Sequence, residues 1–246
     1  MDSSGATQGD RRAPAIAAAP VPADVIGRVA AQLARDKRAH LDELKAEHHQ
    51  LSRPDFLWHY LLQSFATMGQ ASGWKGLIGT PANYRRVTYE ALANLPESAR
   101  LQQVEETCWA AKVRMPSRKA KFIVGCFDCI TKMGGPEAAK NKLLSAAGRD
   151  GKIAFLDAFP GIGDKYARNL LMDVYHEDFR ESIAIDARIE MLSRSWGRTF
   201  RSYEEHERFY LDIARRAGIE GWELDRLMFH HAAEFLARVS QAAEAV

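Results

Sequence analysis

Residues 159–169, FPGIGDKYARN, interrupt a helix-rich sequence with one proline and two glycines. Helix-forming residues flank the motif on both sides, so the chain must pass from one helix to the next within a few residues. Glycine tolerates positive φ and lets another backbone approach closely, which suits so short a connection. Between the glycines stands Ile162, which can fill the groove between the helices beside Leu156 and Leu170. The motif predicts a tight helical hairpin over residues 151–175.

The remaining sequence also shows helical periodicity, and no pair of strong strand candidates emerges. We therefore expect an all-α fold of about ten helices. The expected helices cover residues 23–50, the apolar part of 52–68, part of 80–96, 101–112, 117–133, 136–147, 151–159, 164–175, a stretch after Asp186, 202–217 and 221–243.

Composition narrows the class of protein further. With 46% hydrophobic and 27% charged residues, the chain can bury a core. No stretch approaches the roughly 20 apolar residues of a membrane helix, and no secretory signal is evident. Three cysteines are too few for a disulfide framework, so we expect a reducing cytoplasmic setting. We also expect a monomer without membrane contact. Residues 1–22 are small and proline-rich, which predicts a disordered tail.

Positive charge is concentrated in one segment of the chain. The net charge of the whole protein is +2, yet Lys112 to Lys142 contains eight basic and two acidic residues. A basic face of this kind suits a phosphate backbone, and Lys119 is our candidate contact within it. A solvated helix face explains the same pattern equally well.

The hairpin itself suggests a ligand. The amides of Gly161, Ile162 and Gly163, with those of the following helix N-terminus, can point outward at a phosphate oxygen. Such contacts ignore base identity, so the element would hold DNA without reading its sequence. An ordinary helical hairpin with no ligand is the alternative.

Two segments resemble a known family. LDAFPGIGDKYARNLLM, followed by IAIDARIEML, is similar to the helix-hairpin-helix Gly-Pro-Asp superfamily of DNA glycosylases, and SRKAKFIVGCFDCITKMGG resembles the helix before the hairpin in endonuclease III. The resemblance covers about residues 55–197. It implies a DNA-binding cleft between a central bundle, 55–180, and a second helical subdomain formed by 23–54 with 181–246.

The resemblance assigns catalytic roles to two residues. Lys165 occupies the position of the lysine nucleophile of the bifunctional members, and Asp186 that of the catalytic aspartate. A carboxylate stabilises positive charge that develops at C1′ when the base leaves. An amine can attack C1′ and form a Schiff base that permits β-elimination of the 3′ phosphate. The attacking amine must be neutral, so we expect desolvation or a neighbouring cation beside it.

Each residue also has a simpler explanation. Lys165 could be a solvated lysine or a phosphate contact, although the helix dipole mildly disfavours a cation in a first turn. Asp186 precedes an amphipathic helix and can serve as its N-cap. A capping carboxylate is held rigidly and can still turn one oxygen towards a cleft, so both roles can coexist.

The sequence departs from the family at two places. Family members often carry a histidine two residues after the aspartate, where this chain has Arg188, a possible phosphate contact. Endonuclease III carries four cysteines for an iron–sulfur cluster, which are missing here. The CFDC stretch, Cys126 to Cys129, has no companion pair, so core cysteines are expected and neither a metal nor a cofactor.

A glycosylase must flip its target nucleotide out of the stack and hold it in a pocket, and a further side chain can fill the gap left in the duplex. The candidates for these tasks are aromatic and amide side chains: Trp58, Gln63, Gln70, Trp74 and Phe229. For each of them a place in the core or on the surface is an alternative.

The function expected from the resemblance is base-excision repair of double-stranded DNA that contains a damaged base. Lys165 without cluster cysteines favours 8-oxoguanine as the lesion, with cleavage of the abasic site by Schiff-base chemistry. A non-catalytic helix-hairpin-helix DNA-binding protein and a protein-interaction module stay open as alternatives.

Overall fold

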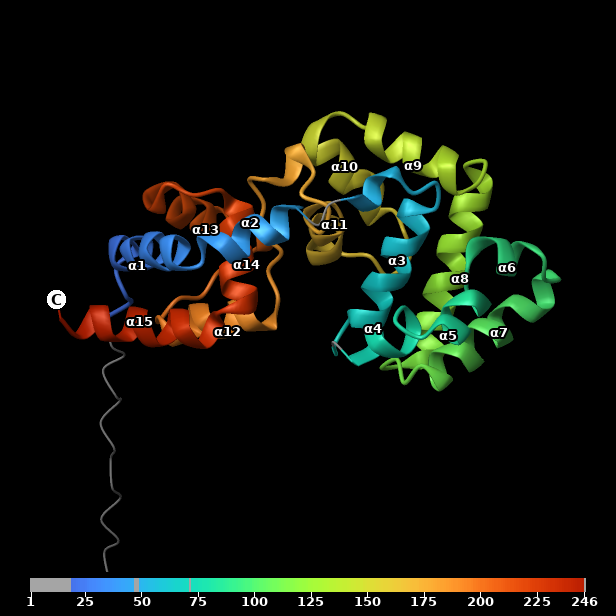
Figure 1. Ribbon diagram of the computed structural model, residues 1–246, viewed down its shortest axis with the longest axis horizontal. Coiled ribbons are helices and arrows are strands. Elements are labelled where there is room, and N and C mark those ends of the chain that lie inside the picture. Colours follow the sequence, from blue (N-terminus) through green and yellow to red (C-terminus); the bar gives the residue numbers. More distant parts are fainter. Residues whose placement is uncertain (1–18, 47–48, 71, 246) are drawn as a thin grey trace, which may run out of the picture.

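The computed structural model describes residues 19–46, 49–70 and 72–245, and the regular elements in these ranges are all helices (Figure 1). The predicted all-α fold is confirmed. The helices are α1 (Ala23–Asp36), α2 (Arg38–Ala46), α3 (Phe56–Thr67), α4 (Ser72–Leu77), α5 (Pro81–Arg86), α6 (Tyr89–Ala93), α7 (Glu97–Ala110), α8 (Pro116–Lys132), α9 (Pro136–Ser145), α10 (Gly148–Asp157), α11 (Asp164–Met172), α12 (Ala187–Ser195), α13 (Tyr203–Ala217), α14 (Gly221–His230) and α15 (Ala232–Glu244), with 3-10 turns at His49–Ser52 and Glu177–Phe179.

Helix contacts fall into two groups, which lie on opposite sides of Figure 1. Helix α1 packs against α13, α14 and α15, and α12 packs against α14 and α15. In the other group α3 is central and contacts α4, α8, α9 and α11. The residue limits of the two subdomains, 55–180 and 23–54 with 181–246, stay a prediction.

The predicted N-terminal tail lies only partly within the described residues. Residues 1–18 fall outside them. Val21, near the end of the predicted tail, donates its amide to the carbonyl oxygen of Trp196 at 3.0 Å and accepts from Arg198 at 2.7 Å. Backbone order therefore begins before residue 23.

Two long helices expected from the sequence are broken, although neither contains glycine or proline at the break. The predicted helix 23–50 bends at Lys37, and the bend lets Leu41 of α2 reach the core. The predicted helix 221–243 breaks at His231, after which α15 lies against α1 and α12. Tertiary packing thus sets both breaks, and the chain has more helices than the ten expected.

The hairpin between α10 and α11 forms as predicted, but its two glycines differ. Gly161 has φ of +81°, and a Cβ there would lie 2.5 Å from the ring of Phe122. Ile162 is buried in the same core as Leu156 and Leu170. Gly163 has extended backbone, is exposed, and has open space where a Cβ would stand. The fold therefore requires glycine at 161 and not at 163.

A buried carboxylate joins the hairpin to the rest of the fold. Glu207, on α13, is only 4% exposed and accepts from Arg168 Nε at 3.0 Å. It also accepts from the guanidinium of Arg149 and, at 3.1 Å, from the backbone amide of Ile183. One side chain thus connects α10, α11 and α13 with the extended chain that leads into α12.

We expect Glu207→Ala to lower the free energy of unfolding by about 3–5 kcal/mol, because it leaves the buried Arg168 and the half-buried Arg149 without their shared carboxylate. Urea unfolding measures the loss. The control is Glu190→Ala, which breaks an exposed pair with Arg194 (2.9 Å) and should cost less than about 1 kcal/mol. Equal losses in the two variants would contradict the structural role given to Glu207.

Candidate active site

Lys165 stands in the first turn of α11 and is half-buried. Its ammonium lies 4.6 Å from the ring centroid of Tyr166. Within the described residues no hydrogen bond or ion pair holds this ammonium, although its charge acts on Asp173 and opposes the rise of that carboxyl's pKa. The amine therefore lies within electrostatic range of the Asp173 carboxyl but forms no salt bridge with it.

Asp186 is the N-cap of α12, as the sequence predicts. Its Oδ1 accepts from the amides of Arg188 at 2.9 Å and Ile189 at 3.0 Å. Both bonds use the same oxygen, so Oδ2 has no hydrogen-bond partner among the described residues. The side chain is half-buried and held in one orientation, with one oxygen available to a ligand.

The extended chain before Asp186 is held by side chains from other helices. The amide of Ile183 donates to Glu207, and that of Ala184 donates to Asp225 Oδ1 at 2.8 Å. The amide of Ile185 donates to the hydroxyl of Tyr203 at 2.9 Å. Three successive backbone amides thus donate to side chains and not to a neighbouring strand. These bonds fix the extended chain and with it the position of Asp186.

Three carboxylates lie within electrostatic reach of one another at this site: Asp173, Asp186 and Asp225. Burial raises the pKa of Asp225 to about 6, with Arg226 opposing the rise and the other two carboxylates adding to it. Burial also raises the pKa of Asp173, again against Arg226. The site is therefore an acidic cluster with cations at Arg226 and Lys165.

The sequence analysis missed Asp173, Asp225 and Arg226. Asp173 follows Lys165 by eight residues, a little over two helical turns, so the two residues can share one broad face of the helix. That spacing was a usable signal. Arg226 and Asp225 are 8% and 3% exposed within α14, where nothing in the sequence separates buried polar residues from surface ones.

Two of the predicted base-pocket residues do join the cluster. Gln63, on α3, donates from Nε2 to Asp173 Oδ2 at 3.0 Å. Trp74, on α4 and 43% exposed, donates from Nε1 to Gln63 Oε1 at 3.2 Å. The indole, the amide and the carboxylate therefore form a hydrogen-bonded chain that runs from the surface to the cluster.

Other predicted residues are placed differently. Trp58 is fully buried and donates to the carbonyl oxygen of Val87 at 3.0 Å, so it is core and not part of a base pocket. Lys119 was expected to contact DNA, but it is 1% exposed and donates to the carbonyl oxygen of Met68 at 2.6 Å. Burial lowers the pKa of Lys119 to about 8. Gln70 lies apart from the cluster and donates to Lys112 O at 2.5 Å.

The predicted phosphate contact Arg188 and the predicted pocket residue Phe229 contact each other. The guanidinium carbon of Arg188 stands 4.3 Å from the centroid of the Phe229 ring, and Nη1 donates to the Phe229 carbonyl oxygen at 2.6 Å. Phe229 is 43% exposed, so the pair lies at the protein surface, beside His230. Both residues stay available to a large ligand.

A cavity of about 260 Å³ adjoins the acidic cluster. Its wall combines residues from both helix groups, and those relevant to its chemistry are Tyr60, Asp173, Trp222, Arg226 and His230. The cavity therefore opens between the two groups, on the side of α11 that carries Asp173.

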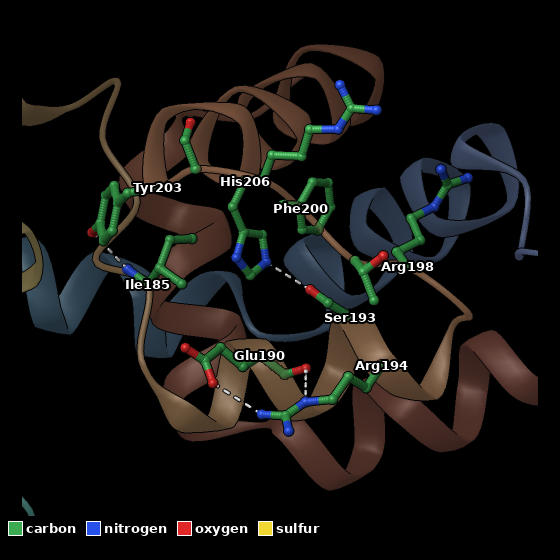
Figure 2. Close-up of a pocket in the computed structure, with 11 residues that line it drawn as sticks. Ile185, Glu190, Ser193, Arg194, Arg198, Phe200, Tyr203 and His206 are labelled. Carbon is green, nitrogen blue, oxygen red and sulfur yellow. Dashed lines mark hydrogen bonds and ion pairs between the residues drawn. The ribbon is translucent and has the colours of Figure 1, made fainter.

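A larger hollow of about 460 Å³ lies between α12 and α13 (Figure 2). His206 points into it from α13, stacks on Phe200 at 4.1 Å and bonds through Nε2 to Ser193 Oγ at 2.7 Å (Figure 2). Burial lowers the pKa of His206 to about 4, so the ring is neutral at pH 7. Its contacts give it a packing role, and neither Lys165 nor Asp186 lines this hollow.

In the described part of the chain no three His, Cys, Asp or Glu residues are arranged to hold a metal ion. Cys126 is buried and donates weakly to the carbonyl oxygen of Pro160 at 3.6 Å, as expected of a core cysteine. No helix within these residues is both long and apolar enough to span a bilayer.

Comparison with solved structures identifies the fold. The 8-oxoguanine DNA glycosylase of Thermotoga maritima superposes with a TM-score of 0.63 at 15% identity, over 85% of this chain and 96% of that one. The 8-oxoguanine DNA glycosylase of Methanocaldococcus jannaschii gives 0.59 at 17% identity, over 85% and 93%. No protein-family model and no curated sequence matches the chain. The fold expected from the resemblance is confirmed.

We expect Asp225→Asn to remove a pH dependence of stability. The folded-state pKa of about 6 exceeds the unfolded value of about 3.9, so folding stability is lost as pH rises from about 4 to 6. Asparagine cannot ionise, and its oxygen can still accept from Ala184. The variant's free energy of unfolding should therefore gain about 2–3 kcal/mol on the wild type's between pH 4 and pH 7. Urea unfolding at four pH values measures this, and parallel curves would contradict it.

Proposed function

We propose that this protein is a DNA glycosylase that removes a damaged base and then cleaves the abasic site. The observation that carries the proposal is the pair Lys165 and Asp186. Among the described residues no hydrogen bond or ion pair engages the Lys165 ammonium in the first turn of α11. Within the same ranges the Asp186 carboxylate, at the N-cap of α12, keeps one oxygen without a hydrogen-bond partner. The fold shared with the two 8-oxoguanine DNA glycosylases supports this reading.

The two residues divide the chemistry. As the bond from C1′ to the base breaks, positive charge develops on the sugar, and the Asp186 carboxylate stabilises it. The neutral amine of Lys165 forms a bond to C1′, while the base leaves with the electron pair and takes up a proton. Opening of the sugar ring gives a protonated Schiff base. Loss of a C2′ proton then expels the 3′ phosphate by β-elimination.

The hairpin supplies a place for the DNA backbone. Gly163 is the N-cap of α11 and provides no side-chain cap, so the amides of the first turn can meet a phosphate oxygen. Gly163 is exposed and leaves open space beside these amides. Arg188 is a second candidate for phosphate contact, and Lys119 is excluded by its burial.

We favour 8-oxoguanine as the lesion. The combination of Lys165 with no cluster cysteines supports it, and so do the names of the two structural neighbours. Double-stranded DNA is accordingly the proposed partner.

Borohydride trapping tests the proposal. We expect wild-type protein to form a covalent adduct with DNA that carries an abasic site or 8-oxoguanine, because borohydride reduces the Schiff base. Lys165→Gln should lose the adduct entirely, whereas Lys142→Gln, at an exposed lysine of the same helix group, should keep it. Salt-dependent DNA binding without any adduct would identify a non-catalytic binding protein instead. Absence of both would leave a protein-interaction module.

The two hairpin glycines should separate stability from DNA binding. Gly161→Ala meets the Phe122 ring and a positive φ, so we expect a loss of about 1–3 kcal/mol in the free energy of unfolding. Gly163→Ala has room within the protein and should keep wild-type stability. Its methyl group would stand where the phosphate approaches, so DNA affinity should fall about tenfold. Unaltered affinity of a stable Gly163→Ala variant would argue against the hairpin as the phosphate site.

A further inference from the structure

The cavity between the helix groups contains an unusual pair of polar groups. Arg226 is 8% exposed, lines the cavity, and has a buried Nη2 with no hydrogen-bond partner among the described residues. Its closest charged neighbours are Asp173 Oδ1 at 3.3 Å and Asp225 Oδ2 at 3.7 Å. These ion pairs lack hydrogen-bond geometry, and a buried donor left unsatisfied costs about 1–3 kcal/mol. The guanidinium is therefore ready to donate to a bound ligand.

The two oxygens of Asp173 are not equivalent. Oδ2 accepts from the amides of Gln63 and Asn169, each at 3.0 Å, and these two bonds fill its lone pairs. Among the described residues, Oδ1 has the ion pair with Arg226 and accepts no hydrogen bond. The groups placed against both oxygens of this carboxyl are donors, two side-chain amides and a guanidinium, so Asp173 acts as an acceptor at this site. The cavity wall thus presents a hydrogen-bond acceptor directly beside a donor.

This arrangement selects a ligand edge in which a donor stands next to an acceptor. A ring N–H beside a carbonyl oxygen, as in a cyclic amide, meets both requirements: the N–H donates to Asp173 and the oxygen accepts from Arg226. 8-Oxoguanine has two such edges, N1–H beside C6=O and N7–H beside C8=O. Adenine carries the reverse order, with its donor on the exocyclic N6 and acceptors at the ring nitrogens N1 and N7. In the orientation that suits 8-oxoguanine, adenine would therefore oppose acceptor to acceptor at Asp173 and donor to donor at Arg226.

The remaining wall and the position of the cavity also suit a nucleobase. Tyr60 and Trp222 provide aromatic surface, and the volume of about 260 Å³ lies just below the roughly 300–1,000 Å³ typical of larger ligands. Asp173 follows Lys165 by eight residues, about 12 Å along the helix. A nucleoside and the lysine side chain together can bridge that distance, so a base in the cavity leaves its sugar near Lys165.

We propose that Asp173 and Arg226 read the cyclic-amide edge of the base that is flipped into this cavity. The proposal rests on the proposed function. It adds the residues that decide which bases are accepted and the class of base: one with a ring N–H next to a carbonyl oxygen.

Asp173→Asn is the sharpest variant because its outcome depends on orientation. Gln63 and Asn169 both donate to the Oδ2 position, so the new amide must turn its oxygen towards them. Its NH₂ group then occupies the Oδ1 position and opposes the ring N–H of the base. We expect single-turnover release of 8-oxoguanine to fall about 10- to 100-fold. The matched control is Asp157→Asn, at an exposed aspartate of the same hairpin, which should release the base at the wild-type rate.

Trapping on DNA with a preformed abasic site separates base reading from chemistry, since no base is present. Asp173→Asn should form this adduct within about twofold of wild type. Wild type should release 3-methyladenine, which lacks the cyclic-amide edge, far more slowly than 8-oxoguanine, and Asp173→Asn should narrow that difference. Wild-type release of 8-oxoguanine by the variant would overturn the proposal. Equal loss of release and abasic-site trapping, at unchanged thermal stability, would overturn it as well.

Calorimetry measures the affinity of the protein for free bases. It tests the proposal even if the wild type proves inactive or Asp173→Asn does not fold. We expect wild type to bind 8-oxoguanine at least tenfold more tightly than adenine, and Arg226→Lys, which keeps the charge and loses the planar donors, to abolish that preference. If wild type neither releases a base nor forms an adduct, the proposed function fails, and this preference alone decides the cavity's role. If Asp173→Asn does not fold, Arg226→Lys carries the same comparisons. Equal affinity for both bases would overturn the proposal.

Discussion

The Glu207 carboxylate determines how the candidate site is assembled. A buried carboxylate is costly unless charged donors surround it, and here two arginines and one backbone amide do so. Arg168 belongs to the helix that begins beside Lys165, and Ile183 lies three residues before Asp186. The helix that carries Lys165 and the extended chain that leads to Asp186 are therefore both held by one shared acceptor. Without it, the hydrogen bond from Arg149 Nε to Ser182 Oγ, at 2.7 Å, would still join α10 to the extended chain, but Arg168 of α11 would lose its link to that chain.

The acidic cluster extends the same principle. Asp225 satisfies the amide of Ala184, while Asp173 gathers the amides of Gln63 and Asn169. Each carboxylate thus performs structural work with one oxygen. The second oxygen accepts no hydrogen bond from a described residue in Asp186, or in Asp173, where it forms an ion pair with Arg226, so it can accept one from a ligand. In these side chains one carboxylate oxygen holds the fold and the other can bind a ligand. The structural bond keeps the side chain rigid while the second oxygen can still accept a hydrogen bond.

Local patterns in the sequence were sufficient for part of this. The hairpin and the cap at Asp186 depend on neighbouring residues only, and both formed as predicted. Predictions that depended on exposure were less secure: Trp58 and Lys119 proved to be buried. Lys119 illustrates the reason, since a lysine within a basic helical segment is normally solvated, and only the approach of the Met68 carbonyl makes its burial possible. The breaks at Lys37 and His231 likewise follow from packing across the chain and not from residues at the break.

By itself, the sequence determined that the chain is helical, that a glycine hairpin interrupts it near residue 161, and that a lysine and a capping aspartate follow at a family-like spacing. The tertiary structure alone decided which polar side chains are buried and which carboxylate oxygens can still accept from a ligand. It also decided that Arg226 of α14 pairs with Asp173, the C-cap of α11, in the wall of a cavity. The reason is physical. Helix formation and capping are governed by interactions within a few residues, whereas burial and charge pairing depend on distant segments that come together only in the folded chain.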